Sequence, residues 1–196
     1  MQFKLVTTDK VKLLGVIIAN DLSWRENTDY ICSKVNKKIF IISKLKQFGF
    51  QTKELINAWT TILRPNAEYA APLWHSGLTT SDTKRLERLQ KIVLGIILGT
   101  TYIDCRKHSK IDNKPYTYEE TVQILGLTTL YQRREDLTNN FALQTVAKEF
   151  HSDMFPLSET SRINTRSRAI YSEFICKTNR YYKSAIPYMA RNLNKC

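Results

Sequence analysis

A proline- and aromatic-rich stretch from Leu63 to His75 constrains the fold more than any other part of this 196-residue chain. Pro65 and Pro72 lack a backbone N–H and fix their own φ angles, so a helix that reaches this stretch must kink or restart at each proline. Three alanines leave room for another helix to approach, and Tyr69 and Trp74 supply large apolar surfaces with one polar group each. The stretch predicts a buried, bent centre.

Amphipathic helices are predicted before and after this centre. Apolar residues recur at helical spacing from Ile31 to Leu45, preceded by a sequence with the form of a capping box at Ser23–Glu26 and ended by Gly49. A second helix is capped by Thr52, and a third is capped around residues 80–82 and stopped by Gly99. Short links between these helices favour an antiparallel bundle.

Two further helices are predicted in the second half of the chain. A capping box at Thr117–Glu120 starts a short helix that Gly126 closes. A long helix follows from about Thr129, and Arg133 and Arg134 near its start are followed by two acids, so local charge pairing competes with phosphate binding. The residues predicted to be buried on this long helix are Leu130, Leu137, Phe141, Val146 and Phe150.

Strand character is confined to the first 20 residues. Residues 2–7 alternate apolar and polar side chains, and residues 11–18 are rich in β-branched types, with a turn expected at residues 8–10. A two-stranded hairpin is marginal by itself in water, so it is expected to pack on a helix or extend a sheet supplied by a neighbour.

The charge balance favours a polyanionic partner. Thirty Lys and Arg against eighteen Asp and Glu give a net charge of +12, which points first to nucleic acid and second to an anionic membrane, against the alternative of a basic protein with neither partner. The first long helix carries five lysines opposite its apolar stripe, and these either contact phosphates or form a solvated face. These lysines are Lys34, Lys37, Lys38, Lys44 and Lys46.

Two other segments combine positive charge with a lack of apolar periodicity. The loop from Thr100 to Pro115 contains Arg106 and Lys107, and the segment after His151 mixes basic residues with aromatic ones. Basic residues interleaved with aromatics suit single-stranded nucleic acid, but the same aromatics can instead anchor a tail to the bundle.

Familiar catalytic patterns are missing from the sequence. A two-metal polymerase site needs paired carboxylates after a strand, and the adjacent acids of this chain are predicted on helices, where neighbours point in different directions. Cys105 and His108 lack a second ligand pair for zinc, and the four cysteines have no paired spacing. The longest apolar run, Ile92 to Leu98, is too short to cross a bilayer. No catalytic residue, metal site, cofactor or membrane partner is expected. The protein is expected in a reducing, intracellular compartment, either cytoplasm or nucleus.

A series of short motifs resembles the region after the palm in reverse transcriptases of jockey-like non-LTR retrotransposons. The motifs keep their order over nearly the whole chain: Lys12–Val16, Leu22–Trp24, Tyr30–Ile31, Leu63–His75, Arg85–Lys91, Tyr118–Glu120, Leu125–Leu127, Arg133–Arg134 and Ile186–Tyr188. The resemblance implies a polymerase thumb and C-terminal segment that holds an RNA template and DNA primer. The paired palm aspartates are absent, so Mg²⁺ is expected only in a polymerase with its fingers and palm, and Met1 downstream of the palm suggests a truncated copy or a fragmentary gene model.

The sequence thus predicts a mainly α protein. A β-hairpin (1–20) resembling the end of a palm next to the primer grip precedes a thumb-like helical bundle (21–150) and a less ordered basic tail (151–196). The expected nucleic-acid-binding residues are Lys12, Lys34, Lys37, Lys38, Lys44, Arg106, Lys107, Arg166 and Arg168. Two alternatives stay open: an independent host nucleic-acid-binding module, and an inert retrotransposon relic.

Overall fold

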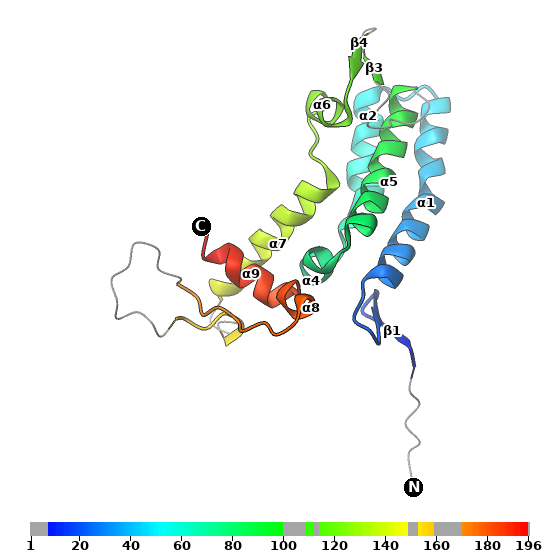
Figure 1. The fold of residues 1–196 in the computed structure, drawn as a ribbon. Coiled ribbons are helices and arrows are strands. Elements are labelled where there is room, and N and C mark those ends of the chain that lie inside the picture. Colours follow the sequence, from blue (N-terminus) through cyan, green and yellow to red (C-terminus); the bar gives the residue numbers. More distant parts are fainter. Residues whose placement is uncertain (1–7, 100–108, 112–113, 149–152, 159–169, 196) are drawn as a thin grey trace. The chain divides into compact units, whose positions relative to one another are not determined.

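A computed structural model describes residues 8–99, 109–111, 114–148, 153–158 and 170–195. The described part of the chain is mainly helical with a short antiparallel hairpin near its start, as the sequence predicted (Figure 1). It divides into two compact units. Unit 1 takes its residues from Met1–Tyr69 and Leu78–Tyr131, and unit 2 from Ala70–Gly77 and Gln132–Cys196. The predicted domain boundaries at residues 20 and 150 stay a prediction.

The N-terminal hairpin covers the whole of residues 11–18, which had been predicted as one strand. Strand β1 (Lys10–Leu13) pairs with β2 (Val16–Ala19), so residues 11–18 are not one strand, and the turn is at Leu14–Gly15 rather than at residues 8–10. Both turn residues have positive φ, 46° and 85°, the combination that two-residue hairpin turns of type I′ require. The other predicted strand, residues 2–7, lies outside the described residues.

Helix α1 (Arg25–Gln47) follows the hairpin and differs from prediction at its start. Trp24 is the N-cap and makes no side-chain capping bond, so the expected capping box at Ser23 does not form. The Glu26 carboxylate that would complete it accepts a hydrogen bond from Lys10 Nζ at 2.9 Å instead. The C-terminal end is as predicted: Gly49, at φ 86°, allows the Phe50 N–H to reach the Leu45 carbonyl.

The proline-rich stretch bends the chain in three steps. Helix α2 (Thr52–Ala58), capped by Gln51 rather than the predicted Thr52, widens into the π-helix η1 (Trp59–Leu63) and continues as α3 (Arg64–Glu68), which has Pro65 in its first turn. The widening occurs where the Pro65 ring would clash with the carbonyl four residues earlier. Ala70, at φ 53°, then turns the chain into α4 (Ala71–Trp74) and the 3₁₀ turn η2 (His75–Gly77).

The predicted burial of this stretch is half right. Trp74 is fully buried, but Tyr69 is 54% exposed. Tyr69 lies over the hairpin turn, where its hydroxyl donates to the Leu14 carbonyl at 2.8 Å and its ring would be 3.3 Å from a Cβ on Gly15. The tyrosine therefore fixes the hairpin to the end of α3.

Three helices carry the core of unit 1. Helix α5 (Thr80–Leu98), capped by Thr79 and ended at Gly99, packs against both α1 and α2, and Figure 1 shows the three side by side. The fully buried core side chains on them and η1 are Val35, Ile42, Leu55, Trp59, Leu63, Leu86, Val93 and Leu94. The predicted antiparallel bundle is confirmed for this unit.

The chain after α5 contains a second hairpin and the short helix for which a capping box was predicted. Strands β3 (Ser109–Ile111) and β4 (Lys114–Tyr116) form a hairpin that the sequence did not predict. Helix α6 (Tyr118–Ile124) follows, and the predicted capping box between Thr117 and Glu120 is present.

Helix α7 (Leu130–Val146) buries a different face from the one predicted. Leu130 is buried as expected, but Phe141 is 46% exposed, and Phe150 lies outside the described residues. The other predicted core positions, Leu137 and Val146, are half-buried. The other buried side chains of the helix are Arg134, Thr138, Ala142 and Thr145. Threonine hydroxyls can occupy this face because they donate to carbonyls of their own helix, Arg134 O at 2.7 Å and Phe141 O at 2.8 Å.

The C-terminal segment of unit 2 has its own small core. Helices α8 (Asn179–Tyr182) and α9 (Ala185–Leu193) follow residue 170, and the buried cluster joins α7, α9 and residue 155. Its buried members are Ala142, Phe155, Met189, Ala190 and Leu193, and Tyr171 and Phe174 pack against them.

Candidate nucleic-acid interface

Helix α1 places four of the predicted lysines along one flank. Lys34, Lys37 and Lys44 are exposed and Lys38 is half-buried, whereas Val35 and Ile42, on the face of α1 that packs into the bundle, are fully buried. No Asp or Glu occurs in α1 after Asp29. The flank therefore presents positive charge over about 15 Å of helix, the rise of ten residues.

The hairpin adds a fifth cation to this flank. Lys12 Nζ donates to the Tyr30 hydroxyl at 2.9 Å and lies 4.5 Å from the centre of the Tyr30 ring. This hydrogen bond lowers the pKa of Tyr30, and the charges of Lys12 and Lys34 lower it further. Tyr30 is four residues before Lys34, which puts the two on the same side of α1. We call the set Lys12, Lys34, Lys37, Lys38 and Lys44 the α1 basic stripe.

Two lysines of α1 bond to other helices, whereas Lys44 bonds within α1, to Gln47 Oε1 at 3.1 Å. Lys38 donates to Asn66 Oδ1 of α3 at 3.2 Å. Lys46 donates to the carbonyls of Ile96 and Ile97 at the C-terminal end of α5, where a cation is favoured by the helix dipole. Lys46 thus belongs to the packing of the bundle and not to the basic stripe.

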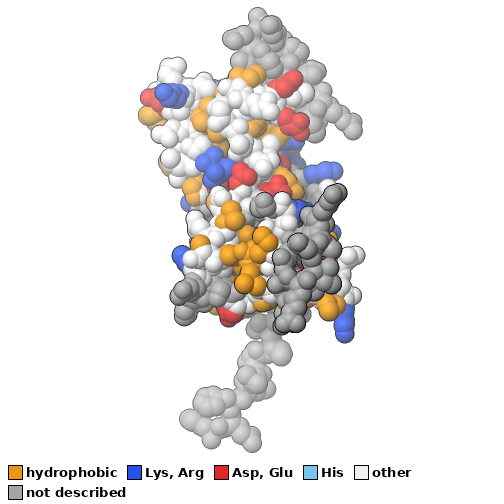
Figure 2. All heavy atoms as spheres, turned by 90° about the vertical axis from the view of Figure 1, so that its left-hand side faces the viewer, with side chains coloured by type: hydrophobic (Ala, Val, Ile, Leu, Met, Phe, Trp, Pro, Cys, Tyr) orange, Lys and Arg blue, Asp and Glu red, His pale blue; other side chains and the backbone are white. Residues whose placement is uncertain are grey.

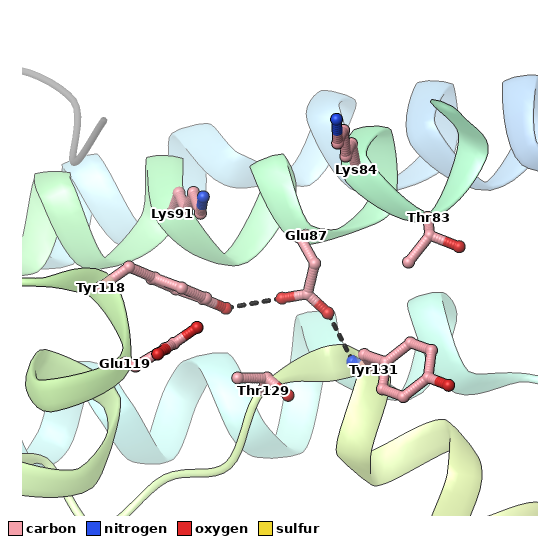
Figure 3. Close-up of a pocket in the computed structure, with 8 residues that line it drawn as sticks. All are labelled: Thr83, Lys84, Glu87, Lys91, Tyr118, Glu119, Thr129 and Tyr131. Carbon is pink, nitrogen blue, oxygen red and sulfur yellow. Dashed lines mark hydrogen bonds between the residues drawn. The ribbon is translucent and has the colours of Figure 1, made fainter. Parts of the chain in front are cut away.

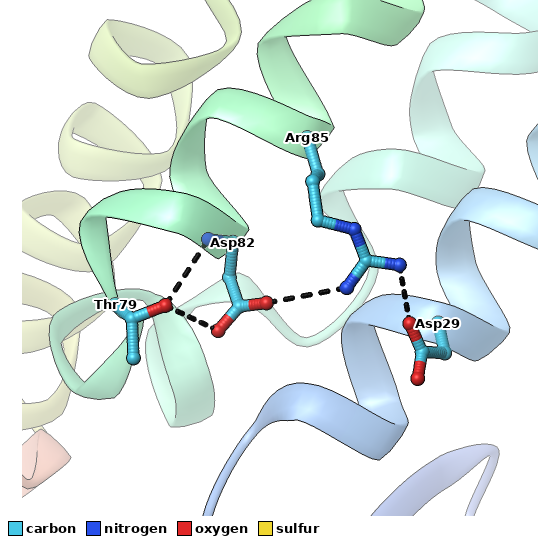
Figure 4. A network of polar contacts seen from close by, with 4 residues as sticks. All are labelled: Asp29, Thr79, Asp82 and Arg85. Carbon is cyan, nitrogen blue, oxygen red and sulfur yellow. Dashed lines mark hydrogen bonds and ion pairs between the residues drawn. The ribbon is translucent and has the colours of Figure 1, made fainter.

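A polar network fixes α1 against α5 at the end near the hairpin (Figure 4). Arg85 of α5 pairs with Asp29 of α1 and, at 3.3 Å, with Asp82, whose other oxygen accepts from the Thr79 hydroxyl at 2.6 Å. Asp29, five residues before Lys34, is therefore neutralised by Arg85. The hydrogen bond that Arg85 donates to the Asp29 carboxylate is the main cause of a raised Arg85 pKa.

A shallow pocket of about 330 Å³ lies on unit 1 between α5, α6 and the start of α7 (Figure 3). Glu87 is at its centre, accepting from the Tyr118 hydroxyl at 2.7 Å and from the Tyr131 N–H. Lys84 and Lys91 line the same side, and Lys91 Nζ is 4.7 Å from the centre of the Tyr118 ring. Since both Glu87 oxygens already accept hydrogen bonds, the carboxylate holds Tyr118 of α6 and the Tyr131 backbone to α5 rather than serving as a free base.

The remaining predicted contacts divide between described and undescribed residues. Arg106, Lys107, Arg166 and Arg168 lie outside the described residues. On the C-terminal segment, Tyr171 and Phe174 pack against the core of unit 2, which agrees with the anchoring alternative for these two aromatics. Tyr182 is 48% exposed, and its ring lies 3.6 Å from the Arg191 guanidinium carbon.

Among the described residues, the face of the protein drawn in Figure 2 has no row of basic side chains like the α1 basic stripe. On the face drawn in Figure 2, Lys and Arg occur singly among hydrophobic, acidic and uncharged side chains. None of the described helices is long and apolar enough to cross a membrane. Within the described residues, no three His, Cys, Asp or Glu side chains are grouped as a metal site would require.

Unit 2 contains a buried pair of basic side chains that sequence reasoning missed. Arg134 is fully buried with its guanidinium carbon 5.9 Å from the centre of the Trp74 ring, so it is not available for phosphate. The His75 ring is buried edge-on against Tyr188, with 6.2 Å between ring centres. Burial, reinforced by the Arg134 charge, lowers the pKa of His75 from 6.5 to about 4.

The shifted His75 predicts an acid-sensitive unit 2. Between about pH 6.5 and pH 4, unfolded His75 binds a proton that folded His75 does not, so the free energy of unfolding falls as pH falls through this window. From pH 7 to pH 5 we expect a loss of about 2 kcal/mol, which urea unfolding at the two pH values would measure. His75→Gln is the control and should lose this part of the pH dependence; an unchanged dependence would contradict the assignment.

Searches with this chain against protein-family models, curated proteins and solved structures each gave no match.

Proposed function

We propose that this chain binds template–primer nucleic acid as the thumb and C-terminal region of a jockey-like reverse transcriptase, and does not polymerise by itself. The observation that carries the proposal is the α1 basic stripe, four lysines on one helix flank continued by Lys12 of the hairpin. Cations in a row attract the phosphate backbone without regard to base sequence, as a protein that must hold any stretch of template–primer requires. The motif series from Lys12–Val16 to Ile186–Tyr188 supports the polymerase origin.

The exposed apolar surface of the hairpin supports the proposal that a neighbouring domain packs against it. Val11, Leu13 and Leu14 are 53%, 57% and 84% exposed, an unusual concentration of apolar surface for a strand and turn in water. In the proposed polymerase, these side chains pack against the palm, and the fingers and palm supply the metal-binding carboxylates. A nucleic-acid partner implies an intracellular location, in cytoplasm or nucleus.

The proposal predicts that the purified chain binds but does not extend a primer. On an RNA template with an annealed DNA primer and Mg²⁺ or Mn²⁺, we expect no incorporation above a no-protein control, because the sequence has no paired aspartates after a strand. The same preparation should bind the annealed substrate in a gel-shift assay. Incorporation that purifies with the chain would contradict the assignment as a binding fragment.

A host nucleic-acid-binding module would use the same basic stripe. The genomic DNA upstream of the Met1 codon distinguishes the two, because an in-frame or decayed palm with two adjacent aspartates would establish descent from a polymerase. The inert-relic alternative predicts no binding at all.

A further inference from the structure

Two phenylalanines of α1 are exposed among the lysines. Phe40 is 61% exposed, and Phe48, which caps the C-terminal end of the helix, is 78% exposed. The apolar face of the same helix is already buried in the bundle through Val35 and Ile42, both fully buried. The two aromatic rings are therefore not part of the core of unit 1.

The rings alternate with lysines along one line of the helix. Lys37, Phe40, Lys44 and Phe48 are separated by three, four and four residues. At 100° per residue they fall within an arc of about 80°, and the two ring positions are about 12 Å apart along the helix axis. Lys37 and Lys44 are exposed, and Lys44 lies between the two rings in sequence. The order along the helix surface is cation, ring, cation, ring.

We propose that Phe40 and Phe48 form a stacking site for unpaired nucleotides whose phosphates contact Lys37 and Lys44. Single-stranded nucleic acid is bound by this combination, because every base has a face that stacks on an aromatic ring and every linkage carries a negative charge. The inference rests on the proposed function, since it extends backbone binding by the α1 basic stripe to a strand that leaves the duplex.

The alternation favours nucleic acid over a membrane surface. A helix that lies on a membrane buries one continuous apolar face in the lipid. The continuous apolar face of α1 is instead packed into the bundle, and the exposed rings are separated by a lysine. Net positive charge along the whole flank also disfavours a basic or neutral apolar protein partner.

The test compares a single strand with a duplex. Fluorescence anisotropy would measure the affinity of the full chain and of the Phe40→Ala/Phe48→Ala variant for a short oligothymidylate and for a blunt RNA–DNA duplex of equal length. We expect the variant to lose about 25-fold or more on the oligothymidylate, about fivefold for each stacked ring, and to keep its duplex affinity.

Two controls separate stacking from other causes. Phe141→Ala removes an equally large ring, 46% exposed on α7, that has no lysine three or four residues away, and it should leave both affinities unchanged. Phe40→Leu/Phe48→Leu keeps apolar surface without an aromatic face, so it should lose oligothymidylate affinity as the alanine variant does.

Each outcome is informative. Full oligothymidylate affinity in either double variant, with duplex binding intact, overturns the stacking site and leaves the proposed function standing. Retained oligothymidylate affinity together with Phe-dependent binding to phosphatidylserine vesicles would assign the rings to a membrane surface. A wild-type chain that binds neither probe refutes the proposed function and the stacking site together.

Discussion

Replacing Lys34, Lys37, Lys38 and Lys44 by Gln is expected to weaken duplex binding strongly and to flatten its salt dependence. If each lysine contacts one phosphate, the four contribute about −3.6 to the slope of log K against log salt, at about −0.9 per contact. Between 50 and 200 mM salt, these contacts alone account for about a 150-fold loss of affinity in the wild type. The variant should lack this part of the salt effect on any duplex sequence.

The control carries the same change in net charge. Lys53, Lys84, Lys177 and Lys183 are exposed and lie outside α1, so their replacement by Gln also removes four positive charges without touching the stripe. Both variants should keep the far-ultraviolet circular dichroism of the wild type, since none of the Lys→Gln changes alters a fully buried residue. Equal losses in the two variants would show that binding follows net charge, and an unchanged affinity and slope in the first would refute the placement of the nucleic acid along α1.

Single Lys→Gln variants are expected to lose different amounts of affinity, because Lys38 already has a hydrogen-bond partner. Its hydrogen bond to Asn66 Oδ1 must be exchanged for a phosphate contact, whereas Lys34 and Lys37 have no such bond to give up among the interactions seen in the described residues. We therefore expect single Lys→Gln changes to cost more at Lys34 and Lys37 than at Lys38.

Helical spacing was a reliable guide wherever apolar and charged residues separated onto opposite flanks. Helix α1 and helix α5 were predicted with their core faces because β-branched and leucine side chains recur every three or four residues. The exposed lysines of α1 follow from the same geometry. Helical spacing thus placed Lys34, Lys37, Lys38 and Lys44 on one side of α1 before any contact was seen.

The errors arose where a tertiary contact outweighed local preference. The hairpin turn at Leu14 was missed because leucine rarely has a positive φ; here its carbonyl accepts from Tyr69, 55 residues later. The rotation of α7 was missed because Arg134 and its threonines are polar, yet Trp74 lies beside the arginine and the hydroxyls bond to the helix itself. Neither contact leaves a short-range pattern in the sequence.

The polar contacts around the α1 basic stripe could be predicted only in part from the sequence. Lys12 was expected from the motif series, but its position on the Tyr30 ring requires the hairpin to fold back on α1. Asn27 fixes that arrangement, because its buried side-chain oxygen accepts from the Ile17 N–H at 3.1 Å. Contacts between the hairpin and α1 cannot be deduced from residue spacing within either element alone.

The π-helical turn that leads into the bent centre predicts a large loss of stability at Trp59. Its side chain is fully buried in η1, just before the widened helix meets Pro65. Trp59→Ala should destabilise unit 1 by about 3–5 kcal/mol, which is expected to lower the melting temperature by roughly 10 °C or more. Ile62→Ala in the same π-helical turn removes a side chain that is 46% exposed, and it should cost much less.

A second substitution tests whether volume or hydrogen bonding gives Trp59 its importance. The indole N–H is buried and has no hydrogen-bond partner among the described residues, so Trp59→Phe removes an unsatisfied donor while keeping most of the aromatic volume. We expect Trp59→Phe to cost about 1 kcal/mol or less, far below Trp59→Ala, in thermal and urea unfolding. If Ala and Phe at this position were equally destabilising, the indole N–H would have to be satisfied in the folded protein. If neither lowered the melting temperature, the π-helical turn would not anchor the packing of α1, and the orientation of the α1 basic stripe would need another source.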